Sequence, residues 1–160
     1  MTERDFINSI LAGAVRLQSS YGLPAAVIIA QACLETGFGK HVVKDIYTGQ
    51  QSFNLFNIKG MGPAGQVRVK TWEVLKGVKV YGEERFRAYS SYQESFDDYA
   101  ALITGSPRYS RAVQAGTDPD KYVQALQQSG YATDPAYALK LSRIMHSQKL
   151  RELVANFLWD

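Results

Sequence analysis

One glutamate stands where its surroundings could turn it into an acid catalyst. Glu35 ends the segment 24–34, whose side chains are apolar almost all the way round, and the loop 36–39 follows it. A helix of that kind belongs in the interior of a protein. Burial and the negative end of the helix dipole both disfavour a carboxylate, so both raise its pKa. A carboxylic acid that keeps its proton near neutral pH can act as a general acid, whereas a buried glutamate paired with Lys or Arg is the structural alternative.

The other chemistry-bearing residues do not indicate metal or nucleophilic catalysis. His41 and His146 have no acidic or cysteine neighbours at ligand spacing, so we expect no metal ion. The single cysteine, Cys33, lies late in the apolar segment, where packing is its expected role. Residues 60–65 have the glycine spacing of a dinucleotide-binding loop, but a strand pattern follows them where a helix is needed. We therefore expect no cofactor, and catalysis would depend on carboxylates.

Glycoside hydrolysis usually requires a second carboxylate as nucleophile, base or charge stabiliser. Glu73 is the preferred partner for Glu35, because it ends the first strand of a predicted hairpin that could face the helix across a cleft. An exposed Glu73 paired with Lys76 explains the spacing equally well. The remaining acidic candidates are Asp45, Asp97 and Asp98.

The segments around these residues predict helices and a small sheet. Helical spacing covers residues 3–20, and the apolar segment forms the second helix. Strand alternation at 66–72 and 78–81, separated by a turn, predicts a β-hairpin that residues 86–89 could extend. Ser91 begins a capping-box pattern, which predicts a further helix.

Two Asp-Pro pairs, at 118–119 and 134–135, each suggest a helix cap followed by proline at the first helical position. The last helix is expected over residues 135–154. Together these elements predict an α+β fold with one mostly helical lobe, a small hairpin lobe and a cleft between them.

The composition fits one ordinary globular domain. The chain has 160 residues, of which 46% are hydrophobic and 21% charged, and its net charge is +3. We expect a single domain over residues 1–160 that acts as a monomer and has no nucleic-acid partner. Between Lys59 and Arg87, seven basic residues outnumber three acidic ones. This local charge could attract an anionic polymer, although a solvated hairpin face is the alternative.

Five motifs follow one another along the chain in the order of a known family. They are AQACLETGFG at 30–39, NLFNIK at 54–59, FRAYSSYQESFDDY at 86–99, SPRY at 106–109 and GYATDP at 130–135. The set resembles the bacterial peptidoglycan N-acetylglucosaminidases, a family that includes the muralytic domain of the flagellar rod-cap protein and many autolysins. The resemblance extends over about residues 4–154, nearly the whole chain.

The resemblance implies a lysozyme-like fold and hydrolysis of the β-1,4 bond after N-acetylglucosamine in peptidoglycan glycan strands. It implies that Glu35 is the general acid and that Glu73 is the second carboxylate. Tyr131 corresponds to the family tyrosine near the scissile sugar and is also assigned to catalysis. The residues expected to hold the sugar are Phe38, Asn54, Phe56 and Tyr131.

Two positions depart from the family pattern. Phe38 stands where Trp is usual, which keeps a stacking face, and Asn57 stands where Gly is usual. Asn tolerates positive φ better than most residues, so we expect the loop to keep its shape. Two other functions stay open: a muramidase or lytic transglycosylase on the same fold, and a non-catalytic glycan-binding or assembly module.

The N-terminal segment MTERDF is polar and lacks the apolar core of a signal peptide. The longest apolar stretch is also too short to span a bilayer, so we expect no membrane insertion. The family resemblance implies action in the periplasm, at the cell wall or in a phage particle. In that case a signal peptide was removed, or the protein is exported by another route.

Overall fold

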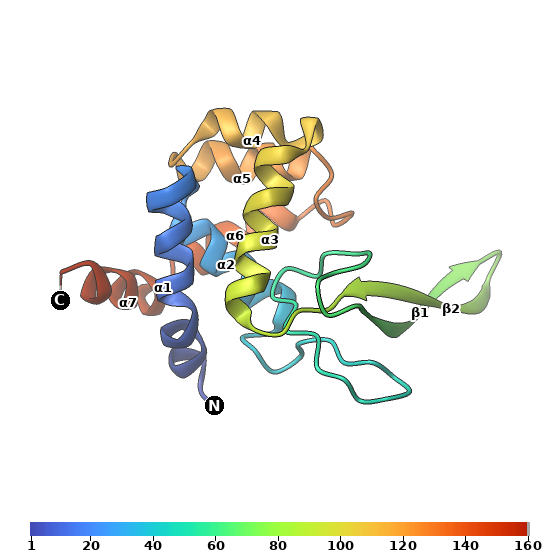
Figure 1. Cartoon of the computed structure of the whole chain (residues 1–160). Coiled ribbons are helices and arrows are strands. Elements are labelled where there is room, and N and C mark those ends of the chain that lie inside the picture. Colours follow the sequence, from blue (N-terminus) through green and yellow to red (C-terminus); the bar gives the residue numbers. More distant parts are fainter. Residues whose placement is uncertain (160) are drawn as a thin grey trace.

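A helical lobe and a long β-hairpin that projects from it make up the computed structural model, which describes residues 1–159 (Figure 1). In chain order the elements are α1 (Glu3–Tyr21), α2 (Ala25–Thr36), β1 (Gln66–Leu75), β2 (Val78–Arg87), α3 (Tyr92–Gly105), the 3-10 turn η1 (Pro107–Tyr109), α4 (Ser110–Ala115), α5 (Pro119–Gln128), α6 (Tyr137–Met145) and α7 (Gln148–Trp159). The predicted combination of a mostly helical lobe with a two-stranded antiparallel sheet is confirmed.

Helix α2 lies in the core of the helical lobe because almost all of its side chains are apolar. Residues 27–33, Cys33 among them, are completely buried, and α1, α5 and α6 pack against the helix. Pro24 is the N-cap of the helix. Gly37 ends the helix with a left-handed φ of 57°, a conformation that glycine adopts without a Cβ clash. This cap fixes the point at which Glu35 leaves the core.

Three other helices begin at side-chain caps, of which those at Ser91 and Asp118 are the ones that the sequence predicts. Thr2 and Asp5 form a reciprocal capping box at the start of α1, with hydrogen bonds of 2.9 and 3.0 Å. Ser91 accepts a hydrogen bond from the N–H of Glu94 at 3.2 Å and so caps α3. Asp118 caps α5 in the same way. Each cap satisfies backbone donors that have no partner inside the helix.

The expected last helix over 135–154 is wrong, because two helices occupy this region. Helix α6 ends at Met145 and α7 begins at Gln148. Ser147 lies between them, and its hydroxyl oxygen accepts a hydrogen bond from the N–H of Leu150 at 3.4 Å. A serine in this position favours a new helix start over continuation of the old one.

The expected helix start at Pro135 is also wrong, by two residues. Asp134 caps a turn instead: its side chain accepts the N–H of Ala136 at 2.8 Å, and its carbonyl accepts the N–H of Tyr137 at 3.1 Å. Helix α6 therefore begins at Tyr137. This turn determines where the Tyr137 side chain enters the core.

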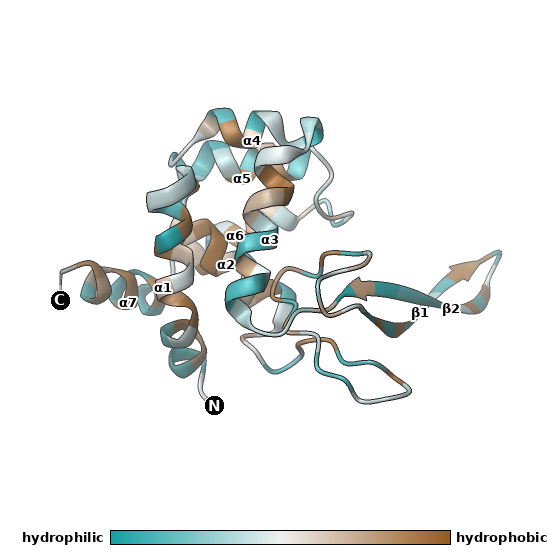
Figure 2. Ribbon diagram, viewed as in Figure 1, coloured by the Kyte–Doolittle hydropathy of each residue, from teal (hydrophilic) through white to brown (hydrophobic). Residues whose placement is uncertain are grey.

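Strands β1 and β2 pair along their whole length, from Gln66 opposite Arg87 to Leu75 opposite Val78. β1 runs three residues past the expected end at 72, so Glu73 lies within the strand, opposite Val80. The outer part of the hairpin is exposed on both faces, and Figure 2 shows hydrophobic residues at its tip. The hairpin thus extends far from the core that holds α2.

The inner end of the hairpin is fastened to the loop that follows α2. Asp45, whose side chain is only 3% exposed, accepts hydrogen bonds from the Arg68 backbone N–H at 2.8 Å and from two guanidinium nitrogens at 2.9 Å. These hydrogen bonds from Arg68 hold the pKa of Asp45 well below its usual range. On the other strand, Arg87 pairs with Asp98 of α3 at 2.9 Å. Both strands therefore have a charged attachment at their base.

No helix within residues 1–159 combines the length and the apolar character that are needed to cross a bilayer.

Candidate active site

Glu35 is half-buried at the C-terminal end of α2. Burial raises the pKa of its carboxyl, and hydrogen bonds from the side chains of Asn57 and Tyr137 partly oppose this rise. None of the ion pairs between residues 1 and 159 includes Glu35. The structural alternative, a buried glutamate neutralised by Lys or Arg, thus finds no support in this part of the chain. A carboxyl in these surroundings is suited to hold a proton for transfer.

The loop beside Glu35 is shaped by the buried amide of Asn54. The Asn54 Nδ2 atom donates to the carbonyls of Ile58 and Arg87, both at 2.9 Å. Its Oδ1 atom accepts from the N–H groups of Phe56 and Ile58 at 3.3 and 3.1 Å. An amide that is completely buried and uses all four of these bonds has no free group for a sugar. We therefore assign Asn54 to holding the loop, in place of the sugar contact that we expected.

Phe56 is also completely buried, so its ring does not face a substrate. The ring packs against Tyr99 and Phe96, with centroid distances of 4.3 and 5.6 Å. Its backbone carbonyl accepts a hydrogen bond from the Tyr131 hydroxyl at 2.9 Å. Phe56 thus connects the loop to the core and to Tyr131.

Asn57 approaches Glu35 most closely from this loop. It adopts a positive φ of 51°, which agrees with the glycine usual at this position. Its Nδ2 donates to the backbone carbonyl of Glu35 at 3.0 Å. Its Oδ1 is buried and has no hydrogen-bond partner within the described residues. Sequence reasoning treated Asn57 only as a departure from the family pattern, whereas the structure places it in the site.

Tyr131, in the turn after α5, lies near Glu35. Its ring stacks on Tyr137 at a centroid distance of 6.0 Å and contacts Tyr109 at 5.9 Å. Burial, helped by the nearby Tyr137 and Glu35, raises the pKa of Tyr131 well above its usual value, so the hydroxyl stays protonated. Because that proton is donated to the Phe56 carbonyl, the phenolic oxygen is left to accept a further hydrogen bond.

Phe38 lies in the loop after α2 with a positive φ of 57°. Its N–H donates to the Cys33 carbonyl at 2.8 Å, and the half-buried ring packs at the margin of the core. Stacking of this ring on a sugar stays a prediction.

A cavity of about 380 Å³ opens next to the residues that surround Glu35. Asn57, Tyr109 and Tyr131 contribute amide and aromatic surface to it. Three cations also line it: Lys59, Arg87 and Arg108. Aromatic faces together with cations suit a sugar that carries anionic substituents.

Glu73 lies on the other lobe. It is exposed in the outer part of the hairpin and lines a shallow hollow of about 230 Å³ together with Thr71, Gly82 and Glu84. The hairpin points away from the helices in Figure 1, and no hydrogen bond or ion pair between described residues links Glu73 to Glu35 or to Lys76. The structure thus brings Glu35, Asn57 and Tyr131 together and leaves Glu73 apart, so the role of Glu73 stays a prediction.

The three other acidic candidates are all paired with arginine. Asp45 binds Arg68 at 2.9 Å, Asp97 binds Arg16 at 2.8 Å and Asp98 binds Arg87 at 2.9 Å. These pairs attach loops and helices to one another, which is a structural role.

Sequence reasoning missed two residues beside Glu35, namely Gln31 and Tyr137. Gln31 is completely buried, and its Nε2 donates to the Tyr137 hydroxyl oxygen at 3.0 Å. The Tyr137 hydroxyl in turn faces the Glu35 carboxyl. One signal was available: Gln31 precedes Glu35 by one helical turn, and a polar residue in an otherwise apolar helix needs a partner.

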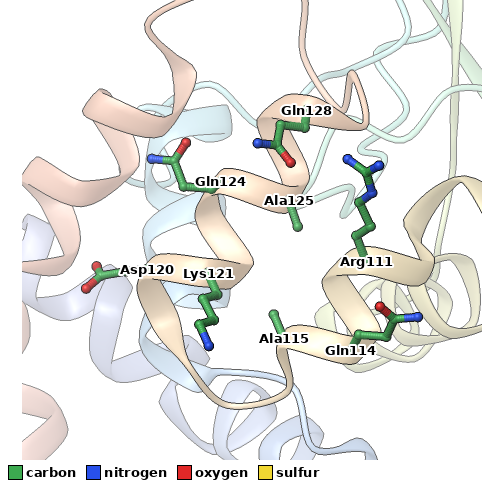
Figure 3. Close-up of a pocket in the computed structure, with 8 residues that line it drawn as sticks. All are labelled: Arg111, Gln114, Ala115, Asp120, Lys121, Gln124, Ala125 and Gln128. Atoms are coloured by element: carbon green, nitrogen blue, oxygen red, sulfur yellow. The ribbon is translucent and has the colours of Figure 1, made fainter.

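A second hollow lies between α4 and α5 and is separate from this site (Figure 3). It is lined mainly by polar side chains such as Arg111, Lys121 and Gln124, and it shares no residue with the surroundings of Glu35. Over residues 1–159, no three His, Cys, Asp or Glu side chains gather as metal ligands would.

Comparisons with known proteins identify the family of this chain. Over residues 11–150 the sequence matches the glucosaminidase family, described as mannosyl-glycoprotein endo-beta-N-acetylglucosaminidase. The peptidoglycan hydrolase FlgJ of Pseudomonas aeruginosa is 37% identical over 153 residues, which are 94% of this chain and 38% of that protein. Exo-glucosaminidase LytG of Bacillus subtilis is 36% identical over 152 residues, 92% of this chain and 52% of that protein. The chain therefore spans about half the length, or less, of these two relatives.

A solved structure of a related protein is similar to this chain over the whole fold. The crystal structure of a mutant peptidoglycan hydrolase from Sphingomonas sp. A1 is 40% identical, and the similarity covers 96% of this chain and 99% of that chain with a TM-score of 0.80. The helical lobe with its hairpin is the lysozyme-like fold that the sequence predicts. With a family match over residues 11–150 and a solved relative that shares the whole fold, this chain belongs to the glucosaminidase family.

Proposed function

We propose that the protein is an endo-β-N-acetylglucosaminidase that hydrolyses the β-1,4 bond after N-acetylglucosamine in peptidoglycan. The observation that carries this proposal is the state of Glu35: it is half-buried, free of any cation among residues 1–159, and flanked by Asn57 and Tyr131, which line a cavity with aromatic and cationic walls. The solved relative from Sphingomonas sp. A1 is a peptidoglycan hydrolase, which supports the same substrate.

In the proposed reaction, Glu35 donates its proton to the glycosidic oxygen as the bond breaks. The sugar at the cleavage point then develops positive charge, which Glu73 stabilises, or Glu73 acts as base on the attacking water. Retaining enzymes hold their two carboxyl groups about 5 Å apart and inverting ones about 6.5–9.5 Å apart. Either route therefore requires the hairpin to bring Glu73 over the sugar that Glu35 contacts.

Tyr131 and Phe38 are proposed to hold the sugar from the helical lobe. The cations of the cavity and of the hairpin suit the carboxylates of the peptide stems. On the hairpin, Lys79 lies 4.3 Å from the centroid of the Trp72 ring and Lys70 lies 4.8 Å from that of Tyr81, so cationic and aromatic groups alternate. We propose that the protein acts outside the cytoplasm, as a monomer, and without insertion into a membrane.

The first test replaces Glu35 with Gln, which keeps the size of the side chain but cannot donate an acidic proton. We expect release of soluble fragments from purified peptidoglycan to fall at least about 100-fold. Glu152→Gln, an exposed glutamate on α7, is the matched control and should keep the wild-type rate. A near wild-type rate in Glu35→Gln would overturn the assignment of the acid.

Mass spectrometry of the released fragments identifies the bond that is cut. Reducing-end N-acetylglucosamine supports the proposal. Reducing N-acetylmuramic acid would instead indicate a muramidase, and an anhydro end would indicate a lytic transglycosylase. Sedimentation with peptidoglycan but no released fragment would indicate a binding module.

A further inference from the structure

A line of hydrogen-bonded side chains crosses the core and reaches Tyr137, whose hydroxyl faces the Glu35 carboxyl. We call it the Gln31 chain. Its members are Tyr122 of α5, Tyr99 of α3, Gln31 of α2 and Tyr137 of α6. All four side chains are buried, so water does not compete for their hydrogen bonds.

The members of the Gln31 chain are joined by hydrogen bonds between their side chains. The hydroxyl oxygens of Tyr122 and Tyr99 are 2.6 Å apart. The Tyr99 hydroxyl donates to Gln31 Oε1. Gln31 Nε2 donates to the Tyr137 oxygen at 3.0 Å, and the Tyr137 hydroxyl faces Glu35.

The amide of Gln31 gives the chain a direction. A side-chain amide accepts only at its oxygen and donates only at its nitrogen. Tyr99 must therefore donate to Gln31, and its own oxygen is left to accept from Tyr122. At the other end Tyr137 must accept from Gln31, so its proton is free for the Glu35 carboxyl. Every donor in the chain points toward the catalytic acid.

We propose that Gln31 and Tyr137 are positioning residues for the general acid: they hold one carboxyl oxygen of Glu35 as a hydrogen-bond acceptor and leave the other oxygen to carry the proton that the sugar receives. This inference rests on the proposed function of Glu35. Tyr137 does not touch the substrate in this account, because it is buried beneath Glu35.

The chain also affects the charge state of Glu35. Burial favours the protonated form, whereas a donated hydrogen bond favours the carboxylate. Tyr137 therefore keeps the pKa of Glu35 below the value that burial alone would produce. The other polar groups that face Glu35 are Asn57, from the loop after α2, and Tyr131, from the turn after α5. Neither receives a hydrogen bond from Gln31.

The test uses Tyr137→Phe, which removes the hydroxyl and keeps the ring. The carboxyl signal of Glu35 is followed by NMR over a pH titration, and the pH profile of hydrolysis is measured in parallel. We expect the Glu35 pKa and the alkaline limb of the profile to rise together by about one pH unit, because one donor is lost. The turnover number at the optimum should fall several-fold, because the carboxyl is less well oriented.

Tyr122→Phe is the matched second variant. It removes the far end of the chain and leaves Tyr137 in place, so the upward change in the Glu35 pKa should be smaller. An unchanged pKa in Tyr137→Phe would show that Tyr137 only fills space and would overturn the inference. A lowered pKa would also overturn it, because it would mean that the Tyr137 oxygen accepts a hydrogen bond from the protonated Glu35 carboxyl instead of donating one.

The two readouts separate the inference from the proposed function. The NMR titration reports on the Gln31 chain even if wild-type protein releases no fragment from peptidoglycan. A raised Glu35 pKa in Tyr137→Phe, without any hydrolysis by the wild type, would support the role of the Gln31 chain and contradict the proposed enzyme activity. Hydrolysis by the wild type, with an unchanged Glu35 pKa in Tyr137→Phe, would support the enzyme activity and contradict the role of the Gln31 chain.

Discussion

At the scale of single residues, the surroundings of Glu35 are held by side chains that a substrate does not reach. Asn54 and Phe56 come from the loop, and Gln31 and Tyr137 come from two helices that cross in the core. All four are buried, and their polar atoms bind the backbone or one another. The surroundings of the Glu35 carboxyl are therefore formed by buried, hydrogen-bonded side chains rather than by exposed groups of the cavity alone.

The role of Glu73 can be tested at this scale. In Glu73→Gln we expect the turnover number to fall while binding to insoluble peptidoglycan stays close to that of the wild type, because the role proposed for Glu73 concerns charge that develops only in the transition state. Turnover is measured by fragment release and binding by sedimentation. Glu83→Gln, on the neighbouring strand, is the control. An unchanged turnover number in Glu73→Gln would move the second role to the acetamido group of the substrate, since Asp97 and Asp98 are held by arginines.

The sequence predicted Glu35 because its evidence is local: an apolar helix, a glycine cap and a motif lie within ten residues. It could not predict Tyr137 as a neighbour, because the hydrogen bond from Gln31 to Tyr137 joins positions 106 residues apart. Asn54 and Phe56 were assigned to the sugar for a related reason. A motif marks a loop near a site, but it does not tell which of its side chains turn into the core.

At the scale of elements, the hairpin depends on attachments at its base. Asp45 accepts five hydrogen bonds, three from Arg68 and one each from the N–H groups of Tyr47 and Thr48. The last two form a turn in the loop after α2, so one carboxylate connects this loop to β1. The charge of Asp45 is needed for all of them, because a protonated carboxyl accepts more weakly.

Acid should therefore loosen this attachment. The folded-state pKa of Asp45 lies below its unfolded value of about 3.9, so its contribution to stability is complete above that pH and is lost as the pH falls toward the folded-state pKa. We expect the melting temperature of the wild type to fall more between pH 6 and pH 3 than that of Asp45→Asn, which has no charge to lose. Thermal unfolding followed by circular dichroism at both pH values checks this. Equal falls of the melting temperature in the two proteins would contradict the stabilising role assigned to the Asp45 carboxylate.

Most elements could be predicted from short-range patterns. The capped helices at 3–20, 91 and 118, and the hairpin, follow from periodicity and capping residues that neighbouring positions supply. The division between α6 and α7 was missed because residues 146–149, His-Ser-Gln-Lys, include no glycine or proline that would end a helix. Ser147, in a position to cap α7, marks the break. Helix boundaries without glycine or proline depend on such capping residues.

At the scale of the whole molecule, the two lobes are stabilised by different contacts. The helices share one hydrophobic core around α2, whereas β1 and β2 make their extensive contacts with each other. The outer hairpin is exposed on both faces. The hydrophobic core thus lies in the helical lobe, and the outer hairpin contributes no side chain to it.

This division predicts that the hairpin can be shortened without unfolding the protein. Residues 72–81 would be replaced by an Asn-Gly turn that joins Thr71 directly to Gly82, its partner across the sheet. We expect the helical circular dichroism and the melting temperature to change little, because the core is intact, and hydrolysis to be lost with Glu73. The full-length Glu73→Gln protein is the control. A shortened protein that still cuts peptidoglycan would exclude every residue of the outer hairpin from the reaction.

The position of Cys33 has a practical consequence for following the two lobes. Burial raises the pKa of its thiol to about 12, so maleimide reagents at neutral pH should leave it unmodified. Cysteines introduced at Lys76, in the hairpin turn, and at Gln124, on the exposed face of α5, could then carry a pair of fluorophores while the native thiol stays in place. Energy transfer between the two dyes would report how far the hairpin travels when a glycan strand occupies the space between the lobes.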